Sequence, residues 1–174
     1  MGQGNDPVPT GRYAAVCFVP PGRKRSDEAN PMISLLYFDD WEFLLGVVKQ
    51  YLECRGDVMV DTARSFTEAV HKIRTNRYDT IVTDYNLAAG AINIDLLRRA
   101  REYGITTPFI FFTLEDHYLT EEEAKMYGPV RFVRKLIPPP SGIKELDRIV
   151  RTNLTDPGVH SPNREYRAER GNPA

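Results

Sequence analysis

Five chemically reactive side chains follow short apolar runs of this sequence. In chain order they are Asp39 and Asp40, Asp84, Thr113, and Lys135. In an open parallel α/β sheet the carboxyl ends of the strands meet at one edge, and ligands bind in the crevice there. Three carboxylates, a hydroxyl and an ammonium at such an edge have the chemistry of a metal-assisted phosphoryl site.

The runs that position these side chains are short and rich in β-branched and aromatic residues, which is typical of strands. The sequence predicts strands over 33–38, 57–62, 79–83, 108–113 and 130–134. The runs before Asp39, Asp84 and Thr113 are continuously apolar, which is typical of strands buried on both faces. The run 57–62 alternates between apolar and polar residues, so we expect it at the edge of the sheet.

Helical spacing of apolar residues separates these runs. The first stripe consists of Trp41, Leu44, Leu45, Val48 and Leu52, and the second of Phe66, Ala69, Val70 and Ile73. The third consists of Ile94, Leu97 and Ala100, and the last of Ile143, Leu146, Ile149, Val150 and Leu154. The expected helix starts are a capping box of Ser65 with Glu68, a cap at Asn93, a capping box of Thr120 with Glu123, and a cap at Ser141. Gly104 and Gly128 are expected to end helices.

Strands and helices alternate strictly in this prediction. Such alternation favours a parallel sheet with helices on both faces and right-handed crossovers. Five βα units of this size predict an α/β fold of the flavodoxin-like, doubly wound kind. The expected strand order of the five-stranded sheet is 2-1-3-4-5.

Proline marks the edges of the folded unit. Of the 13 prolines, five fall in residues 1–31, beside Gly, Asn, Asp and Arg. We therefore expect a flexible N-terminal extension over 1–31, one folded domain over 32–154 and a disordered tail over 155–174. The folded range leaves no room for a DNA-binding or catalytic output domain.

Composition narrows the function classes. The formal net charge of −1 gives no support to a nucleic-acid partner. No apolar run approaches the length of about 20 residues that a membrane span needs. Cys17 and Cys54 have no metal-ligand spacing, which is typical of thiols in a reducing compartment. These features together predict a cytoplasmic protein.

The ordered set of site residues resembles the receiver domain of two-component response regulators, of the stand-alone chemotaxis-receiver kind. The resemblance covers roughly residues 32–154 and rests on an acidic pair, an Asp, a Thr and a Lys, each at a strand end. It implies that Asp84 accepts a phosphoryl group. It also implies that Mg²⁺ is bound by Asp39, Asp40, Asp84 and the backbone carbonyl of Asn86.

The resemblance implies further roles. Lys135 would pair with Asp84 and then with a phosphoryl oxygen, and Thr113 would donate its hydroxyl to another phosphoryl oxygen. Phe132 occupies the position of the family's switch aromatic, although an aromatic on a strand is also an ordinary core residue. The implied partners are a sensor histidine kinase and an unidentified downstream protein. The resemblance also allows a homodimer through the face made by the helix before Gly128, the strand 130–134 and the last helix.

Three features depart from the family pattern. The loop 87–93 is longer and lacks the usual proline, Leu114 follows Thr113 where a small residue is favoured, and Leu136 replaces the proline after Lys135. They leave open a pseudo-receiver that binds a partner constitutively, without phosphorylation. A phosphohydrolase of the haloacid-dehalogenase kind is a further alternative, disfavoured because Asn86 stands where a second Asp is needed. A purely structural alternative is that Asp39 and Asp40 cap the first helix.

Overall fold

The computed structural model describes residues 32–84, 94–114, 124–136 and 140–153. The strands are β1 (Ile33–Phe38), β2 (Val58–Ala63), β3 (Thr80–Thr83), β4 (Phe109–Thr113) and β5 (Val130–Arg134). The helices are α1 (Glu42–Glu53), α2 (Phe66–Thr75), α3 (Ile94–Glu102) and α5 (Pro140–Asn153). Each predicted strand is present, with bounds that differ from the prediction by at most one residue.

The five strands form one parallel sheet in the order β2-β1-β3-β4-β5. The predicted fold class, a flavodoxin-like doubly wound sheet, is confirmed. β2 lies at an edge, as its alternating sequence predicts, and the side chain of Met59 in this strand is exposed. β1, β3 and β4 are buried along their whole length, because helices cover both faces of the sheet at these strands.

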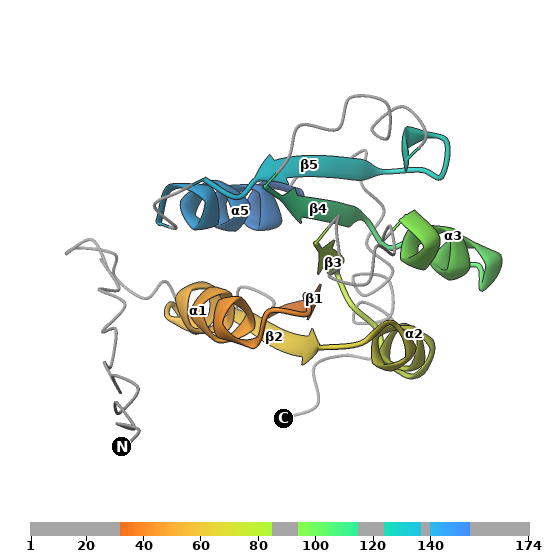
Figure 1. Cartoon of the computed structure of the whole chain (residues 1–174), viewed down its shortest axis with the longest axis horizontal. Helices are drawn as coiled ribbons and strands as arrows, with labels where there is room; N and C mark the ends of the chain where they lie inside the picture. The colour runs from red at the N-terminus through yellow and green to blue at the C-terminus, as the bar shows by residue number, and fades with distance from the viewer. Residues whose placement is uncertain (1–31, 85–93, 115–123, 137–139, 154–174) are drawn as a thin grey trace, which may run out of the picture.

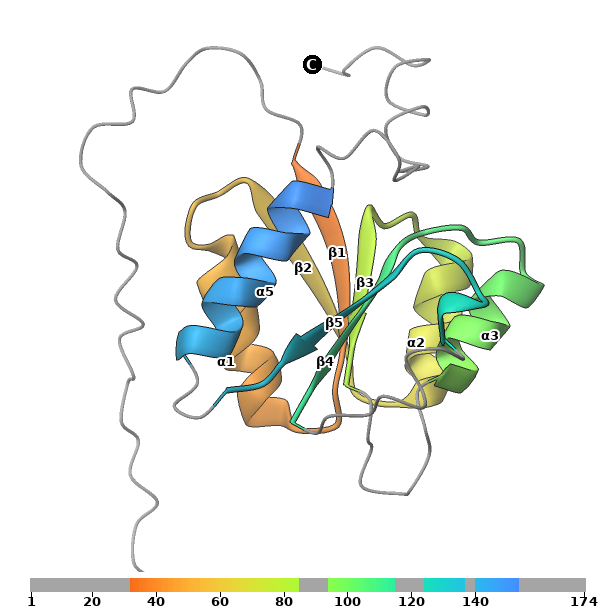
Figure 2. The same ribbon diagram turned by 90° about the horizontal axis from the view of Figure 1, so that it is seen from above.

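Helices α1 and α5 cover one face of the sheet, and α2 and α3 cover the other (Figures 1 and 2). Successive residues of a strand point to opposite faces, so β1 contributes to two separate cores. Leu35 and Tyr37 pack in the core under α1 and α5. Leu36 and Phe38 pack in the core under α2 and α3. Asp39 lies two residues after Tyr37, so by the same alternation its side chain points to the face under α1 and α5.

Three local predictions were wrong in detail. Trp41 is not part of the buried stripe of α1, because it precedes the helix and its side chain is 57% exposed. Ser141 does not cap α5, because the helix begins at Pro140, and proline suits a first helical position. Ser65 does accept from the amide of Glu68. The Glu68 carboxylate, however, binds the amide of Arg64, so the predicted capping box is displaced by one residue.

Other predictions lie outside the described residues. They are the caps at Asn93 and at Thr120 with Glu123, the inward position of Leu154, and the two tails 1–31 and 155–174. Gly104 and Gly128 have positive φ angles of 71° and 107°, which suits their expected places after helical segments. Within the described ranges, no helix is both long and apolar enough to cross a membrane.

Gly142 in the first turn of α5 lies against the end of β5. A Cβ at this position would come within 2.7 Å of both the carbonyl oxygen of Arg134 and the amide nitrogen of Leu136. Both contacts are with backbone, which cannot rotate away as a flexible side chain can. The absence of a side chain at Gly142 therefore sets how closely α5 approaches the segment that carries Lys135.

We expect Gly142→Ala to lower the free energy of unfolding by about 1–3 kcal/mol, because the added methyl group forces the helix and the strand apart. Urea denaturation measures this change. Gly46→Ala is the matched control, because Gly46 lies inside α1 with nothing within 4 Å of its Cβ position. This control should gain up to about 1 kcal/mol from helix propensity. Similar effects of the two substitutions would contradict the close approach at Gly142.

Candidate functional site

The strand register brings the predicted site residues to one edge of the sheet. Asp39 and Asp84 follow the paired strands β1 and β3, and the amide of Asp84 donates to the carbonyl of Phe38 at 3.0 Å. At the end of the strand pair β4 and β5, the amide of Lys135 donates to the carbonyl of Thr113 at 2.6 Å. The strands run in the order β1-β3-β4-β5 here, so four neighbouring strand ends carry the site.

The ammonium of Lys135 lies between two carboxylates. Its Nζ is 2.7 Å from Oδ2 of Asp84 and 2.8 Å from Oδ2 of Asp39. The side chain of Lys135 is buried, and its Nζ lies over the ring of Phe112, 5.5 Å from the ring centroid. The pairing with Asp84 was expected from the family resemblance. The pairing with Asp39 was not, and it shows that one buried cation balances two anions.

Asp39 is fully buried and holds three hydrogen bonds. Its Oδ2 accepts from the hydroxyl of Tyr37 at 2.6 Å and from Lys135, and its Oδ1 accepts from the amide of Trp41 at 2.9 Å. The N-cap residue of α1 is Trp41, so neither aspartate holds the capping position that the structural alternative required. Asp39 instead ties the start of α1 to the site.

Tyr37 is a part of the site that sequence reasoning missed. Its side chain is fully buried, and burial, with the nearby charges of Asp39 and Asp84, raises the pKa of its hydroxyl well above the usual range. The hydroxyl therefore remains a proton donor at neutral pH. One sequence signal was available, because Tyr37 lies two residues before Asp39 on the same face of an otherwise apolar strand.

The two carboxylates at Lys135 differ in exposure. Asp39 is completely buried, whereas the side chain of Asp84 is 15% exposed, so an incoming group reaches Asp84 first. Thr113 is buried beside them at the end of β4. Asp40 is exposed. Among the described residues, no three His, Cys, Asp or Glu side chains are grouped to hold a metal ion.

The donors at this edge nevertheless fit Mg²⁺. This ion prefers oxygen ligands and keeps several waters, so it is commonly bound through one or two carboxylates. Asp39 and Asp84 supply such oxygens side by side, and Asp40 follows directly in the chain. The coordination by Asp39, Asp40 and Asp84 stays a prediction. The backbone carbonyl of Asn86 and the loop 87–93 lie outside the described residues.

The remaining predicted residues surround this centre. Phe132 is half-buried, and its ring stacks on that of Phe111 with centroids 5.0 Å apart. Leu114 and Leu136, two of the departures from the family pattern, have exposed side chains. They follow Thr113 and Lys135 in the chain, so both lie at the rim of the site.

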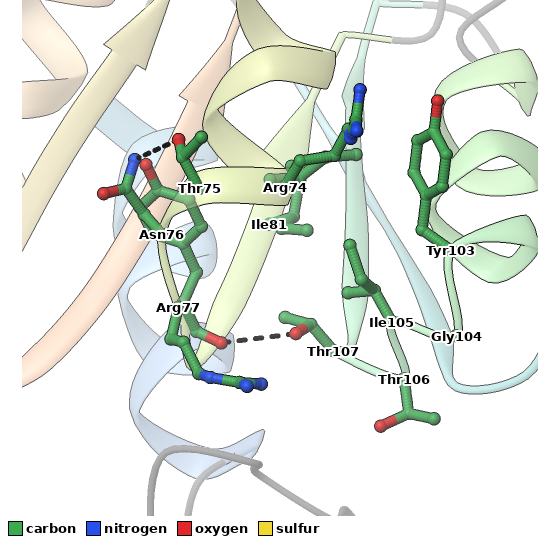
Figure 3. A pocket seen from close by; sticks show the side chains of 12 residues that line it. Arg74, Thr75, Asn76, Arg77, Ile81, Tyr103, Gly104, Ile105, Thr106 and Thr107 are labelled. Carbon is green, nitrogen blue, oxygen red and sulfur yellow. Dashed lines mark hydrogen bonds between the residues drawn. The ribbon is translucent and has the colours of Figure 1, made fainter.

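A separate pocket of about 620 Å³ lies at the other end of the strands, near the amino-terminal ends of β3 and β4 (Figure 3). Residues 73–78 and 103–107 line it, and these segments precede β3 and β4, whereas the site residues follow those strands. The guanidinium of Arg74 lies over the ring of Tyr103 at one end, while Arg77 lies apart from it near Thr107. The two arginines do not converge, so the pocket lacks the common focus of an anion site.

Removing the shared cation should destabilise the fold. We expect Lys135→Met to lower the free energy of unfolding by about 3–5 kcal/mol, because the buried Asp39 and the largely buried Asp84 lose their counter-charge. Urea denaturation at neutral pH measures the loss. Lys144→Met is the control on the exposed side of α5 and should change stability by less than about 0.5 kcal/mol. Equal losses in the two variants would show that the ammonium of Lys135 does not balance the pair.

Comparisons with known proteins agree with this fold. The Francisella response regulator 1452 receiver domain is 28% identical in sequence to this chain, with a TM-score of 0.60. The match covers 69% of this chain and 94% of the Francisella domain. The response regulator domain of Thermotoga maritima CheB is 25% identical, with coverages of 70% and 95% and a TM-score of 0.61. A comparison with curated proteins found no significant match.

A third solved structure adds to the likeness in fold. It is the response regulator TrrA of Thermotoga maritima in complex with Mg(2+)-BeF. TrrA is 22% identical to this chain, and the match has a TM-score of 0.56 and covers 68% of this chain and 99% of TrrA. The family model of the response regulator receiver domain matches residues 35–147. Because that match runs from the first strand into the last helix, the chain belongs to the response regulator receiver domain family.

Proposed function

We propose that this receiver domain accepts a phosphoryl group on Asp84 and changes its protein contacts as a result. The observation that carries the proposal is the unequal pair at Lys135, in which Asp84 is partly exposed and Asp39 is buried. A nucleophile has to be reached by its donor, and Asp84 is the member of the pair that solvent reaches. The family match favours such a signalling module over the hydrolase alternative.

The transfer requires one bond to form and one to break. A carboxylate oxygen of Asp84 attacks phosphorus, and the bond from phosphorus to the donor breaks, leaving its electron pair on the donor. With a phosphohistidine of a sensor kinase, that electron pair stays on the imidazole nitrogen. Such transfers depend mainly on positioning and on neutralising the phosphoryl oxygens. Lys135 already lies 2.7 Å from Asp84, so its ammonium is in place to bind a phosphoryl oxygen.

The same edge would hold Mg²⁺ through Asp39, Asp40 and Asp84, with the carbonyl of Asn86 as the fourth predicted ligand. When bound, the ion supplies positive charge against the phosphoryl oxygens. In the family, a solved relative of the same fold is in complex with Mg(2+)-BeF. Lys135 and the ion would thus divide the neutralisation of the new charge, which is about −1.5 to −2 for a phosphoryl group.

Thr113 and Phe132 would convert the new charge into a change of surface. Thr113 is buried at the end of β4, one strand away from Asp84, and its hydroxyl can donate to a phosphoryl oxygen. Movement of Thr113 would open space beside Phe132 on β5. The ring of the half-buried Phe132 stacks on Phe111, so an inward rotation would break this stacking and bury the ring more completely.

The surface that changes would include β5 and α5, where we place the downstream protein. A homodimer through this face and the preceding segment is a second use of the same surface. The upstream partner would be a sensor histidine kinase. The alternative is a constitutive pseudo-receiver that binds its partner without phosphorylation. Leu114 and Leu136 have exposed side chains next to Thr113 and Lys135, and hindrance of a phosphoryl donor by these side chains would favour this alternative.

Acetyl phosphate with Mg²⁺ tests the proposal. We expect intact-mass measurement to show one added phosphoryl group, stable to acid and labile to base, which Asp84→Asn abolishes. Asp95→Asn is the control, because Asp95 is an exposed aspartate on α3. An adduct that persists in Asp84→Asn would place the phosphoryl group elsewhere. No adduct and no response to Mg²⁺ in the natural protein would support the constitutive module.

Thr113→Ala separates acceptance of the phosphoryl group from the conformational change. We expect this variant to bind beryllofluoride with Mg²⁺, because Asp84 and Lys135 are unchanged. The NMR signals of the Phe132 ring should move in the natural protein and stay in place in the variant. Thr152→Ala, on the exposed side of α5, is the matched control and should behave as the natural protein does. An equal movement in Thr113→Ala would exclude the hydroxyl as the link.

A further inference from the structure

The hydroxyl of Tyr37 is a buried polar group that has no role in the proposed phosphoryl transfer. It comes from the middle layer of the molecule, on β1, and is surrounded by the apolar core under α1 and α5. A phenylalanine would fill the same space. The hydroxyl instead donates to Oδ2 of Asp39 at 2.6 Å, an oxygen that also accepts from Lys135 at 2.8 Å. This donor therefore acts on one predicted metal ligand.

Counting lone pairs shows what the hydroxyl does to Asp39. An ionised carboxylate offers about four lone-pair sites, two on each oxygen. Tyr37 and Lys135 take both sites of Oδ2, and the amide of Trp41 takes one site of Oδ1. One site on Oδ1 remains. While these bonds stand, Asp39 can bind a cation through a single oxygen and cannot chelate it with both.

This restriction matters because divalent cations differ in the carboxylate geometry that they favour. Mg²⁺ demands near-octahedral coordination and takes single oxygens from one or two carboxylates, with water in the other positions. Ca²⁺ is larger, takes six to eight oxygens and readily accepts both oxygens of one carboxylate. A carboxylate held with one free lone pair suits the first ion and handicaps the second.

We propose that Tyr37 is a positioning and specificity-determining residue, which fixes Asp39 for single-oxygen coordination and so favours Mg²⁺ over Ca²⁺ at this site. The inference rests on the proposed function, because it requires that a divalent cation bind beside Asp39. It adds a residue that lies behind the ligands and that selects between ions. Loss of such a supporting hydrogen bond typically costs a metal site about 10–100-fold in affinity.

The test compares Mg²⁺ and Ca²⁺ titrations of the natural protein and of Tyr37→Phe, without any phosphoryl donor. Trp41 is the chain's single tryptophan, and its amide binds Asp39, so its fluorescence can follow both titrations. We expect the variant to bind Mg²⁺ about ten-fold more weakly. Ca²⁺ binding should be unchanged or tighter, because Oδ2 regains a lone pair. The ratio of the two affinities should therefore fall at least about ten-fold.

Tyr78→Phe is the matched control. The hydroxyl of Tyr78 also donates to an aspartate, Oδ2 of Asp61 at 2.7 Å, and the side chain is also buried. This control should leave the ratio of Mg²⁺ to Ca²⁺ affinity unchanged while losing a comparable hydrogen bond. If Tyr37→Phe does not fold, as judged by circular dichroism, Tyr37→Met replaces it, because the flexible methionine fills apolar space without a donor.

The outcomes separate this inference from the proposed function. A natural protein that binds Mg²⁺, beside a Tyr37→Phe variant with the same Mg²⁺ to Ca²⁺ ratio, would overturn the role of Tyr37 and leave the phosphoryl site standing. A natural protein that binds neither ion would overturn both. An equal fall of the Mg²⁺ to Ca²⁺ affinity ratio in Tyr37→Phe and Tyr78→Phe would show that loss of any buried tyrosine hydrogen bond lowers the ratio. That result would also contradict the proposal.

Discussion

The buried ammonium of Lys135, shared between two carboxylates, is the interaction on which the rest of the site depends. Its partners Asp39 and Asp84 lie 96 and 51 residues away in the chain, and the side chains are largely removed from water. Attraction between charges grows as the surrounding dielectric falls, and so does the cost of leaving one charge alone. The sheet order must therefore bring β1, β3 and β5 to one edge in register, since a displaced strand would leave an unbalanced charge inside the protein.

The surroundings make the two carboxylates unequal, and the inequality divides their roles. Asp39 has no exposed surface and is held by Tyr37, Trp41 and Lys135. A carboxylate fixed on three sides is a good support for a cation and a poor nucleophile. Asp84 keeps part of its surface in solvent. Two residues of the same type thus acquire different chemistry from their burial and hydrogen-bond donors alone.

The sequence was a good guide to the sheet, because alternation of apolar runs and helical stripes reports which surfaces are buried. It predicted Asp84 and Lys135 together, because both follow strands whose ends share an edge. It failed at Trp41, because the helical spacing of apolar residues extends one residue before the true start of α1. It also failed at Tyr37, because an aromatic within a buried strand has the pattern of a core residue. The nearby Asp39 is the partner of its hydroxyl, and spacing alone does not separate such a pair from an aspartate that faces solvent at a strand end.

The glycine contact at the start of α5 has a mechanical consequence. The backbone of Gly142 rests against the residues on either side of Lys135, with no side chain between them to absorb a displacement. Tightly packed contacts of this kind transmit displacement instead of damping it. A protein that tilts α5 on docking therefore also shifts the lysine, and a shift of the lysine tilts α5. Such coupling is thermodynamically reciprocal, so a ligand at one end of this contact that shifts it would change the affinity for a ligand at the other end by the same factor.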